Sequence, residues 1–182
     1  MSAAASALPP RRFRSTDGRL SPEMLAAFRD DGYLFLEGFV APAECDRLRA
    51  RALDLVDAFD PAEHRTVFST ASGSHAAAEY FQGSGGKIRF FFEEGAFDEH
   101  GALKQPKALS INKIGHAIHD LDPTFDAFSR TARLRALVRD LGLRDPRLLQ
   151  SMYIFKQPHI GGEVGWHVDS TYLYTEPMSC IG

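Results

Sequence analysis

The chain has 182 residues, of which 44% are hydrophobic and 25% charged, so it can bury one sizeable core. The formal net charge of −3 argues against nucleic acid or an anionic membrane as a partner, and no apolar run is long enough to cross a bilayer. Cys45 and Cys180 are too few for a disulfide framework or a cysteine-based zinc site, so a reducing compartment fits best and we expect a cytoplasmic protein.

Residues 1–19 are expected to form a disordered tail, because Pro9 and Pro10 interrupt any amphipathic helix there. Residues 1–15 contain serines and arginines and no acidic residue, a composition that also resembles a weak mitochondrial presequence. A mitochondrial location is therefore the alternative. Residues 20–182 show no repeat and no linker, and we interpret them as part of a single domain.

A first helix is predicted to begin at Ser21, a good N-cap, with Pro22 at the first helical position and Gly32 at its end. Residues 33–39 are apolar at nearly every position and predict a strand buried under helices. A second helix then begins near Pro42, and apolar residues at a spacing of three or four predict its buried side: Cys45, Leu48, Ala52, Leu55 and Phe59.

The turn-forming residues 83–86 precede residues 87–93, which alternate with the period of a strand and place Ile88, Phe90 and Phe92 on one face. Residues 95–106 indicate a polar loop, and a helical region runs from Asp122 to Gly142. Residues 148–157 and 164–173 predict two further strands, separated by a turn. Helices that come mostly first and strands that come later indicate an α+β fold.

His167 and Asp169 are the residues with the clearest chemical potential. Side chains two positions apart on a strand point to the same face, so the imidazole and the carboxylate would project together. With a second histidine they would make the 2-His-1-carboxylate triad, which leaves open positions on Fe(II) for a co-substrate and dioxygen. The spacing alone is weak evidence, since a surface strand can carry a histidine beside an acid without binding metal.

Several segments together make the metal interpretation stronger. The chain resembles the phytanoyl-CoA dioxygenase family in residues 31–39, 87–93, 110–117, 150–159, 161–163, 166–169 and 173–177. The resemblance implies a double-stranded β-helix, or jelly roll, flanked by helices. It also implies that His167 and Asp169 bind iron, and that Lys113 and Met152 line the pocket for 2-oxoglutarate. Lys113 can donate to a dicarboxylate, and Met152 can pack against its methylene groups; otherwise they would be a solvated lysine and a core residue.

The resemblance implies an Fe(II)- and 2-oxoglutarate-dependent dioxygenase, an oxidoreductase that hydroxylates a C–H bond of a small-molecule substrate and releases succinate and CO2. Ascorbate would be a supporting reductant. The family's second iron-binding histidine and its oxoglutarate-binding arginine are expected beyond residue 182. We therefore expect a fragment, truncated at its C-terminus, that corresponds to the N-terminal part of a longer protein and is inactive alone. The substrate and the oligomeric state do not follow from the sequence.

Two other functions remain open at this point. The first is a truncated, catalytically inactive binding module of the same fold. The second is a metal-dependent enzyme of another kind, in which the metal is held by His159 or by His116 and His119, which are three residues apart and could share a helical face.

Overall fold

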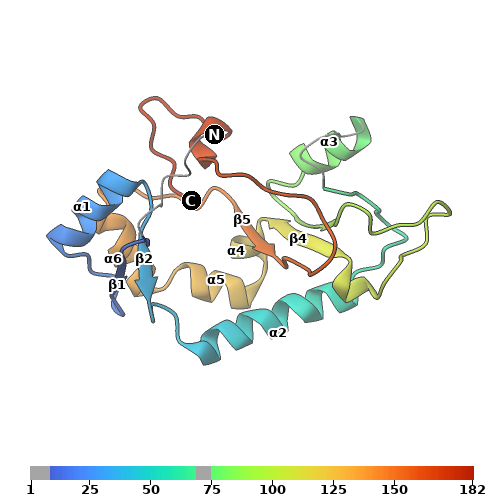
Figure 1. The fold of residues 1–182 in the computed structure, drawn as a ribbon, viewed down its shortest axis with the longest axis horizontal. Helices are drawn as coiled ribbons and strands as arrows, with labels where there is room; N and C mark the ends of the chain where they lie inside the picture. The colour runs from blue at the N-terminus through green and yellow to red at the C-terminus, as the bar shows by residue number, and fades with distance from the viewer. Residues whose placement is uncertain (1–8, 69–74) are drawn as a thin grey trace, which may run out of the picture. The chain divides into compact units, whose positions relative to one another are not determined.

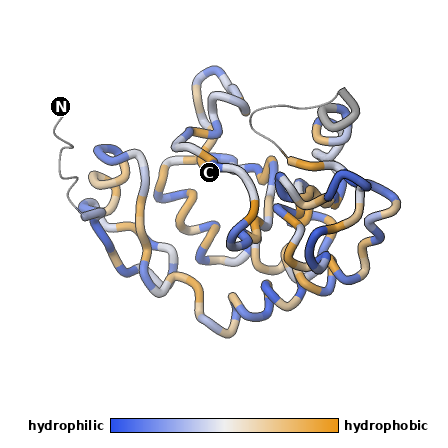
Figure 2. Tube along the Cα trace, turned by 45° about the vertical axis from the view of Figure 1, so that its right-hand side comes forward, coloured by the Kyte–Doolittle hydropathy of each residue, from blue (hydrophilic) through white to orange (hydrophobic). Residues whose placement is uncertain are grey.

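The computed structural model describes residues 9–68 and 75–182, and its ribbon is drawn in Figure 1. The chain forms two compact units, each described here by itself. The first comprises residues Met1–Cys45 and Arg130–Pro146, and the second comprises Asp46–Ser129 and Arg147–Gly182. The tube in Figure 2 alternates between hydrophobic and hydrophilic colours along its length, as expected for elements with one buried side.

The first unit contains strands β1 (Arg12–Arg14) and β2 (Phe35–Glu37), which pair in parallel, and helices α1 (Pro22–Asp31) and α6 (Ala132–Asp140). The predicted start and end of α1 are confirmed: the Ser21 hydroxyl accepts a hydrogen bond from the amide of Met24, and Gly32 adopts the left-handed conformation. The strand predicted over residues 33–39 is shorter, and its expected burial is wrong, because Phe35 is 42% exposed beside a single partner strand.

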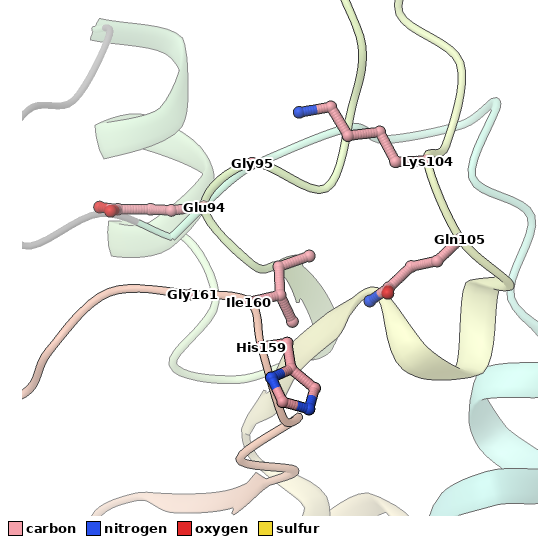
Figure 3. Close-up of a pocket in the computed structure, with 7 residues that line it drawn as sticks. All are labelled: Glu94, Gly95, Lys104, Gln105, His159, Ile160 and Gly161. Atoms are coloured by element: carbon pink, nitrogen blue, oxygen red, sulfur yellow. The ribbon is translucent and has the colours of Figure 1, made fainter.

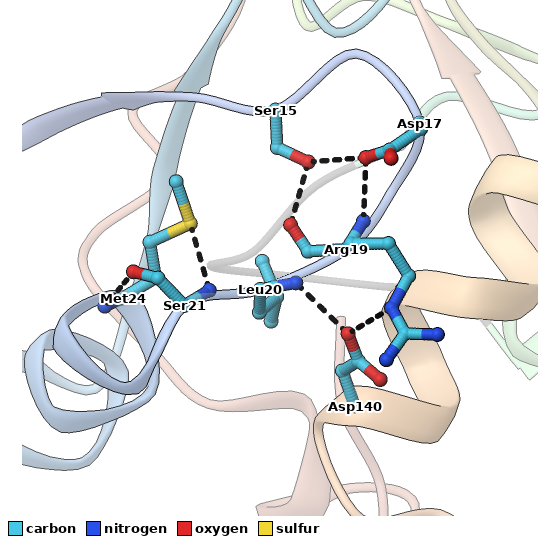
Figure 4. A network of polar contacts seen from close by, with 7 residues as sticks. All are labelled: Ser15, Asp17, Arg19, Leu20, Ser21, Met24 and Asp140. Atoms are coloured by element: carbon cyan, nitrogen blue, oxygen red, sulfur yellow. Dashed lines mark hydrogen bonds and ion pairs between the residues drawn. The ribbon is translucent and has the colours of Figure 1, made fainter.

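The prediction of a disordered tail over residues 1–19 is wrong at β1, because the backbone of this strand pairs with β2. Residues 1–8 of the predicted tail lie outside the described part of the chain. A polar network continues from this strand (Figure 4). The Ser15 hydroxyl donates to the carbonyl of Arg19 at 2.8 Å, while Asp140 on α6 accepts from the amide of Leu20 at 2.8 Å and pairs with the Arg19 guanidinium at 3.0 Å. The segment that leads into α1 is thus fixed to the last turn of α6.

The second unit is built on an antiparallel sheet in the order β3-β4-β5, made of Ile88–Phe92, Ile111–His116 and Ser151–Ile154. Helix α2 runs over Pro42–Ala58, as predicted, and is followed by α3 (His75–Gln82), α4 (Ile118–Leu121) and α5 (Pro123–Ser129). Two short 3-10 helices, η1 and η2, cover Lys107–Leu109 and Asp169–Thr171. None of the described helices is long and apolar enough to cross a membrane.

The core of this unit lies between α2, α5 and one face of the sheet. Leu48, Ala52 and Val56 are the buried residues of α2, and the predicted inclusion of Cys45 is wrong, because this residue is exposed. The Phe59 ring stacks on Phe90 with the centroids 4.3 Å apart. Other members of the cluster come from the sheet, from α4 and α5 and from the loop after β3: Phe92, Ala96, Ile111, Ile114, Ile118 and Phe125.

The α+β class is confirmed, since helices and sheets are mixed in the chain. The described strands form a three-stranded and a two-stranded sheet, so the jelly roll stays a prediction. Of the last two predicted strands, residues 148–157 contain the shorter β5, whereas a strand over residues 164–173 is wrong. That segment is irregular and ends in η2, because no described strand hydrogen-bonds to it as a ladder partner.

Candidate functional site

The face of the sheet opposite the core carries two of the predicted site residues. Lys113 on β4 pairs with Phe91 on β3 and with Ile154 on β5, and Gly115, two residues later, pairs with Met152. Lys113 and Met152 are therefore diagonal neighbours on adjacent strands, a relationship that places two residues about 7–8 Å apart. Residues that are 39 positions apart in the sequence thus border the same surface, as the resemblance implied.

Lys113 is buried, with only 5% of its surface exposed, so it is not a solvated lysine. Its Nζ lies 3.2 Å from the ring centroid of Phe68, 5.2 Å from that of Phe81 and 5.6 Å from that of Phe91. Burial lowers the pKa of Lys113 to about 8. The described residues place no carboxylate at ion-pair distance from this nitrogen. Three phenyl rings thus hold a cation whose charge an incoming anion could neutralise.

Met152 is 40% exposed, so it does not fill the core. Gly115 lies opposite the methionine on the neighbouring strand, where a Cβ would lie 3.5 Å from the Met152 Cγ, an ordinary van der Waals contact. A half-exposed thioether beside a buried ammonium offers an apolar wall next to a charged group. This pair suits a ligand that joins a carboxylate to a short methylene chain.

His167 and Asp169 lie close together, although the strand predicted to carry them is absent. His167 Nε2 is 3.4 Å from Asp169 Oδ1, and the two side chains are 59% and 41% exposed. Asp169 begins η2, whose backbone bonds from the amides of Tyr172 and Leu173 to its carbonyl hold it in place. A turn rather than a strand therefore brings the imidazole and the carboxylate together.

The hydrogen bond on the other side of the His167 ring determines which nitrogen is available. Nδ1 lies 2.9 Å from the carbonyl oxygen of Gly165, and a carbonyl can only accept, so Nδ1 carries the proton. A neutral His167 then presents the lone pair of Nε2 toward Asp169, a contact that is favourable only with a proton or a cation between them. Two ligand atoms on adjacent positions of a metal, each about 2.1 Å from it, are about 3 Å apart. The pair fits two ligands of one iron.

The other histidines do not complete this pair. His116 ends β4 and His119 lies in α4, so the predicted shared helical face is wrong. His119 is paired through Nδ1 with the Ser151 hydroxyl at 2.6 Å and through Nε2 with Asp120 at 3.4 Å. Across residues 9–68 and 75–182, no three histidine, cysteine, aspartate or glutamate side chains are arranged to hold a metal ion. The alternative centres at His116, His119 or His159 therefore find no support.

His159 instead borders an open cavity of about 450 Å³ (Figure 3). In this view the side chains of Glu94 and Lys104 point away from His159. Gly95, Ile160 and Gly161 complete the lining. None of the four predicted site residues contributes to this cavity, and its chemistry does not suggest a ligand.

Most residues that surround Lys113 were not predicted as part of a site. Phe68 and Phe81 come from segments with no predicted element, and Ser84 lies in a predicted turn with no role of its own, whereas His116 was considered only as an alternative metal ligand. Phe81 also contacts Tyr172, with ring centroids 6.4 Å apart, which joins the surroundings of Lys113 to η2. Only the abundance of phenylalanine, with 14 copies, hinted at an aromatic surface.

Known proteins are similar to this chain over most of its length. Residues 28–182 match the family model described as phytanoyl-CoA dioxygenase (PhyH). The chain is 49% identical over 167 residues to phytanoyl-CoA dioxygenase domain-containing protein 1 of Bos taurus, a match that covers 89% of this chain and 57% of the relative. It is 48% identical over 165 residues to a phytanoyl-CoA dioxygenase of Arabidopsis thaliana, covering 91% and 58%. The chain thus spans somewhat more than half the length of the curated relatives it matches.

Proposed function

Because the chain belongs to the phytanoyl-CoA dioxygenase family, we propose that the intact protein is an Fe(II)- and 2-oxoglutarate-dependent dioxygenase. It would hydroxylate a C–H bond of a small-molecule substrate. The observation that supports this most directly is the pairing of His167 Nε2 with Asp169 Oδ1 at 3.4 Å, in a unit that also places Lys113 and Met152 on one face of a sheet.

His167 and Asp169 would hold the iron, with the Gly165 carbonyl fixing the imidazole in the tautomer that leaves Nε2 free to bind. Iron, when bound, supplies the chemistry that couples the decarboxylation of 2-oxoglutarate to succinate and CO2 with hydroxylation of the substrate. A further histidine and an arginine, which this proposal needs, would come from the part of the protein that corresponds to the rest of its relatives' length.

Lys113 would bind a carboxylate of 2-oxoglutarate. The ammonium is already stripped of most of its water by the three phenyl rings, so a carboxylate that enters gains a charge-assisted hydrogen bond in surroundings of low polarity. Met152 would pack against the methylene groups and exclude water from that side. These two residues orient the co-substrate and take no part in bond breaking.

The names of the relatives make acyl-CoA esters the first substrates to test. The experiment is to incubate the intact protein with Fe(II), 2-oxoglutarate, ascorbate and a panel of fatty acyl-CoA esters and free acids, and to follow succinate and hydroxylated product. Succinate formed at a fixed ratio to one hydroxylated product would support the proposal. Succinate at the level of a protein-free iron blank, with every substrate, would overturn it.

A further inference from the structure

His116 is a buried residue for which the proposed reaction has no use. It is 1% exposed, and its Nε2 has no hydrogen-bond partner among the described residues. A buried polar atom without a partner costs about 1–3 kcal/mol, so such an atom calls for an explanation. The His116 ring cannot easily rotate toward solvent, because it packs against two phenyl rings. Its ring centroid lies 4.9 Å from that of Phe81, in an edge-on arrangement, and 5.5 Å from that of Phe91.

The hydrogen bond at Nδ1, on the opposite side of the ring, determines whether Nε2 donates or accepts. Nδ1 lies 2.6 Å from the hydroxyl oxygen of Ser84, which is fully buried. That hydroxyl donates its one hydrogen to the carbonyl oxygen of Phe81, so it can only accept from the ring. Nδ1 therefore carries the proton, and Nε2 is a lone pair. Burial and the nearby charge of Lys113 lower the pKa of His116 to about 4, which keeps the ring neutral at physiological pH.

The nearest cation is the ammonium of Lys113. Its Nζ lies 5.2 Å from Phe81 and 5.6 Å from Phe91, the same two rings that pack against His116. Lys113 and His116 are both on β4, and apart from Lys113 no charged residue is found against the His116 ring in the described part of the chain. The Lys113 ammonium has three N–H groups to donate, and the His116 Nε2 can accept one hydrogen bond and has no partner among the described residues. Both groups border the rings of Phe81 and Phe91.

We infer that His116 is a positioning residue for Lys113: its Nε2 accepts one N–H of the Lys113 ammonium when that group turns from the Phe68 ring toward a carboxylate of the co-substrate. The inference rests on the proposed function. A second N–H then remains for the carboxylate, so the imidazole fixes the direction of the ammonium as well as its place. Ser84 contributes by holding the ring in the tautomer that accepts.

The test is a double-mutant cycle in the intact protein, with Fe(II) and without oxygen. The dissociation constant of 2-oxoglutarate is measured by calorimetry for the wild type, Lys113→Met, His116→Phe and the double variant. We expect His116→Phe to weaken binding about tenfold or more when Lys113 is present and to change nothing when it is absent. His116→Gln, whose amide oxygen can accept in place of Nε2, should recover part of the loss.

Two further variants separate positioning from folding. His119→Phe replaces the neighbouring buried histidine, which already has its partners, and should lower the melting temperature without coupling to Lys113. Ser84→Ala keeps the His116 ring but releases its tautomer, so it should weaken co-substrate binding only when Lys113 is present. If His116→Phe does not fold, Ser84→Ala tests the same coupling to Lys113.

The outcomes distinguish the inference from the function on which it rests. If His116→Phe weakens binding equally with and without Lys113, or does not weaken it, His116 has only a structural role and the inference is overturned. If Lys113→Met itself leaves the dissociation constant unchanged, the role of Lys113 in the proposed function is wrong, and the inference is overturned with it.

Discussion

His167 Nε2 lies 3.4 Å from Asp169 Oδ1 in a segment without regular strand structure. Nδ1 donates a hydrogen bond to the Gly165 carbonyl, which leaves Nε2 on the side of the carboxylate, as the proposed metal site requires. Both side chains are substantially exposed, which leaves room for a metal and for further ligands on the outer side.

The first prediction concerns Lys113. Lys113→Met should weaken 2-oxoglutarate binding by about 1.5–3 kcal/mol, the range for a hydrogen bond to a charged group. The melting temperature should stay the same or rise, because methionine fills similar space against Phe68 without the cost of a buried charge. Calorimetry and thermal unfolding measure the two quantities. A large loss of stability with unchanged affinity would show that Lys113 serves the fold.

The second prediction is a pH dependence of co-substrate affinity. Because the pKa of Lys113 is about 8, the free protein loses this charge as the pH rises above 8, and the 2-oxoglutarate dissociation constant should rise up to about tenfold per pH unit there. The lowered pKa of Lys113 also makes stability depend on pH. Between pH 8 and 10.5 the lysine is mostly protonated in the unfolded chain and mostly neutral in the folded protein, so the free energy of unfolding rises with pH.

Lys113→Arg provides the control for this pH profile, because a guanidinium stays charged throughout the range. Its dissociation constant, even if higher overall, should be flat between pH 7 and 9.5. A wild-type profile that is equally flat would exclude the Lys113 ammonium as the titrating group.

The third prediction tests the link between α2 and the start of α5. The buried Asp122, 1% exposed, accepts a hydrogen bond from Arg51 at 2.7 Å and caps α5 through the amides of Thr124 and Phe125. Asp122→Ala should therefore lower the free energy of unfolding by about 3 kcal/mol, measured in urea. Asp54→Ala, an exposed aspartate on α2, is the matched control and should change it by less than about 0.5 kcal/mol. Equal effects of the two variants would contradict this role of Asp122.

Helix α1 was among the most predictable parts of the fold, because its signals are local. Ser21 and Gly32 cap α1 with groups that act within a few residues of the helix, so their signals are complete in the sequence. Strand β3 was predicted for a similar reason, because Phe90 and Phe92 repeat with a period of two.

Strand β4 shows why other parts could not be predicted. Its residues include Lys113 and Gly115, which are unusual in a buried strand and are buried here because β3 and β5 pair on both sides. The opposite error occurred at residues 164–173, where apolar content predicted a strand that has no ladder partner among the described strands. The spacing of His167 and Asp169 predicted that their side chains lie together, and they do, although a turn and not a strand positions them.

The fourth prediction concerns the polypeptide of residues 1–182. Only two ligands with the expected geometry are found among its described residues, so it should bind Fe(II) weakly and form succinate no faster than a protein-free iron blank. The intact protein, assayed in parallel, is the control. Turnover by residues 1–182 well above the blank would show that a third ligand comes from within, and would direct mutagenesis to His116, His119 and His159.

The central claim is that His167 and Asp169 bind the iron of an oxygenase, and Asp169→Ala in the intact protein tests it most directly. Removing one anionic ligand should reduce bound iron and abolish 2-oxoglutarate-dependent succinate formation, while Glu99→Ala, at an exposed loop position, should leave both unchanged. Iron content and succinate are measured on the same samples, with thermal unfolding to confirm the fold. Loss of both in a folded Asp169→Ala protein is the predicted result, and wild-type levels of both would contradict the account.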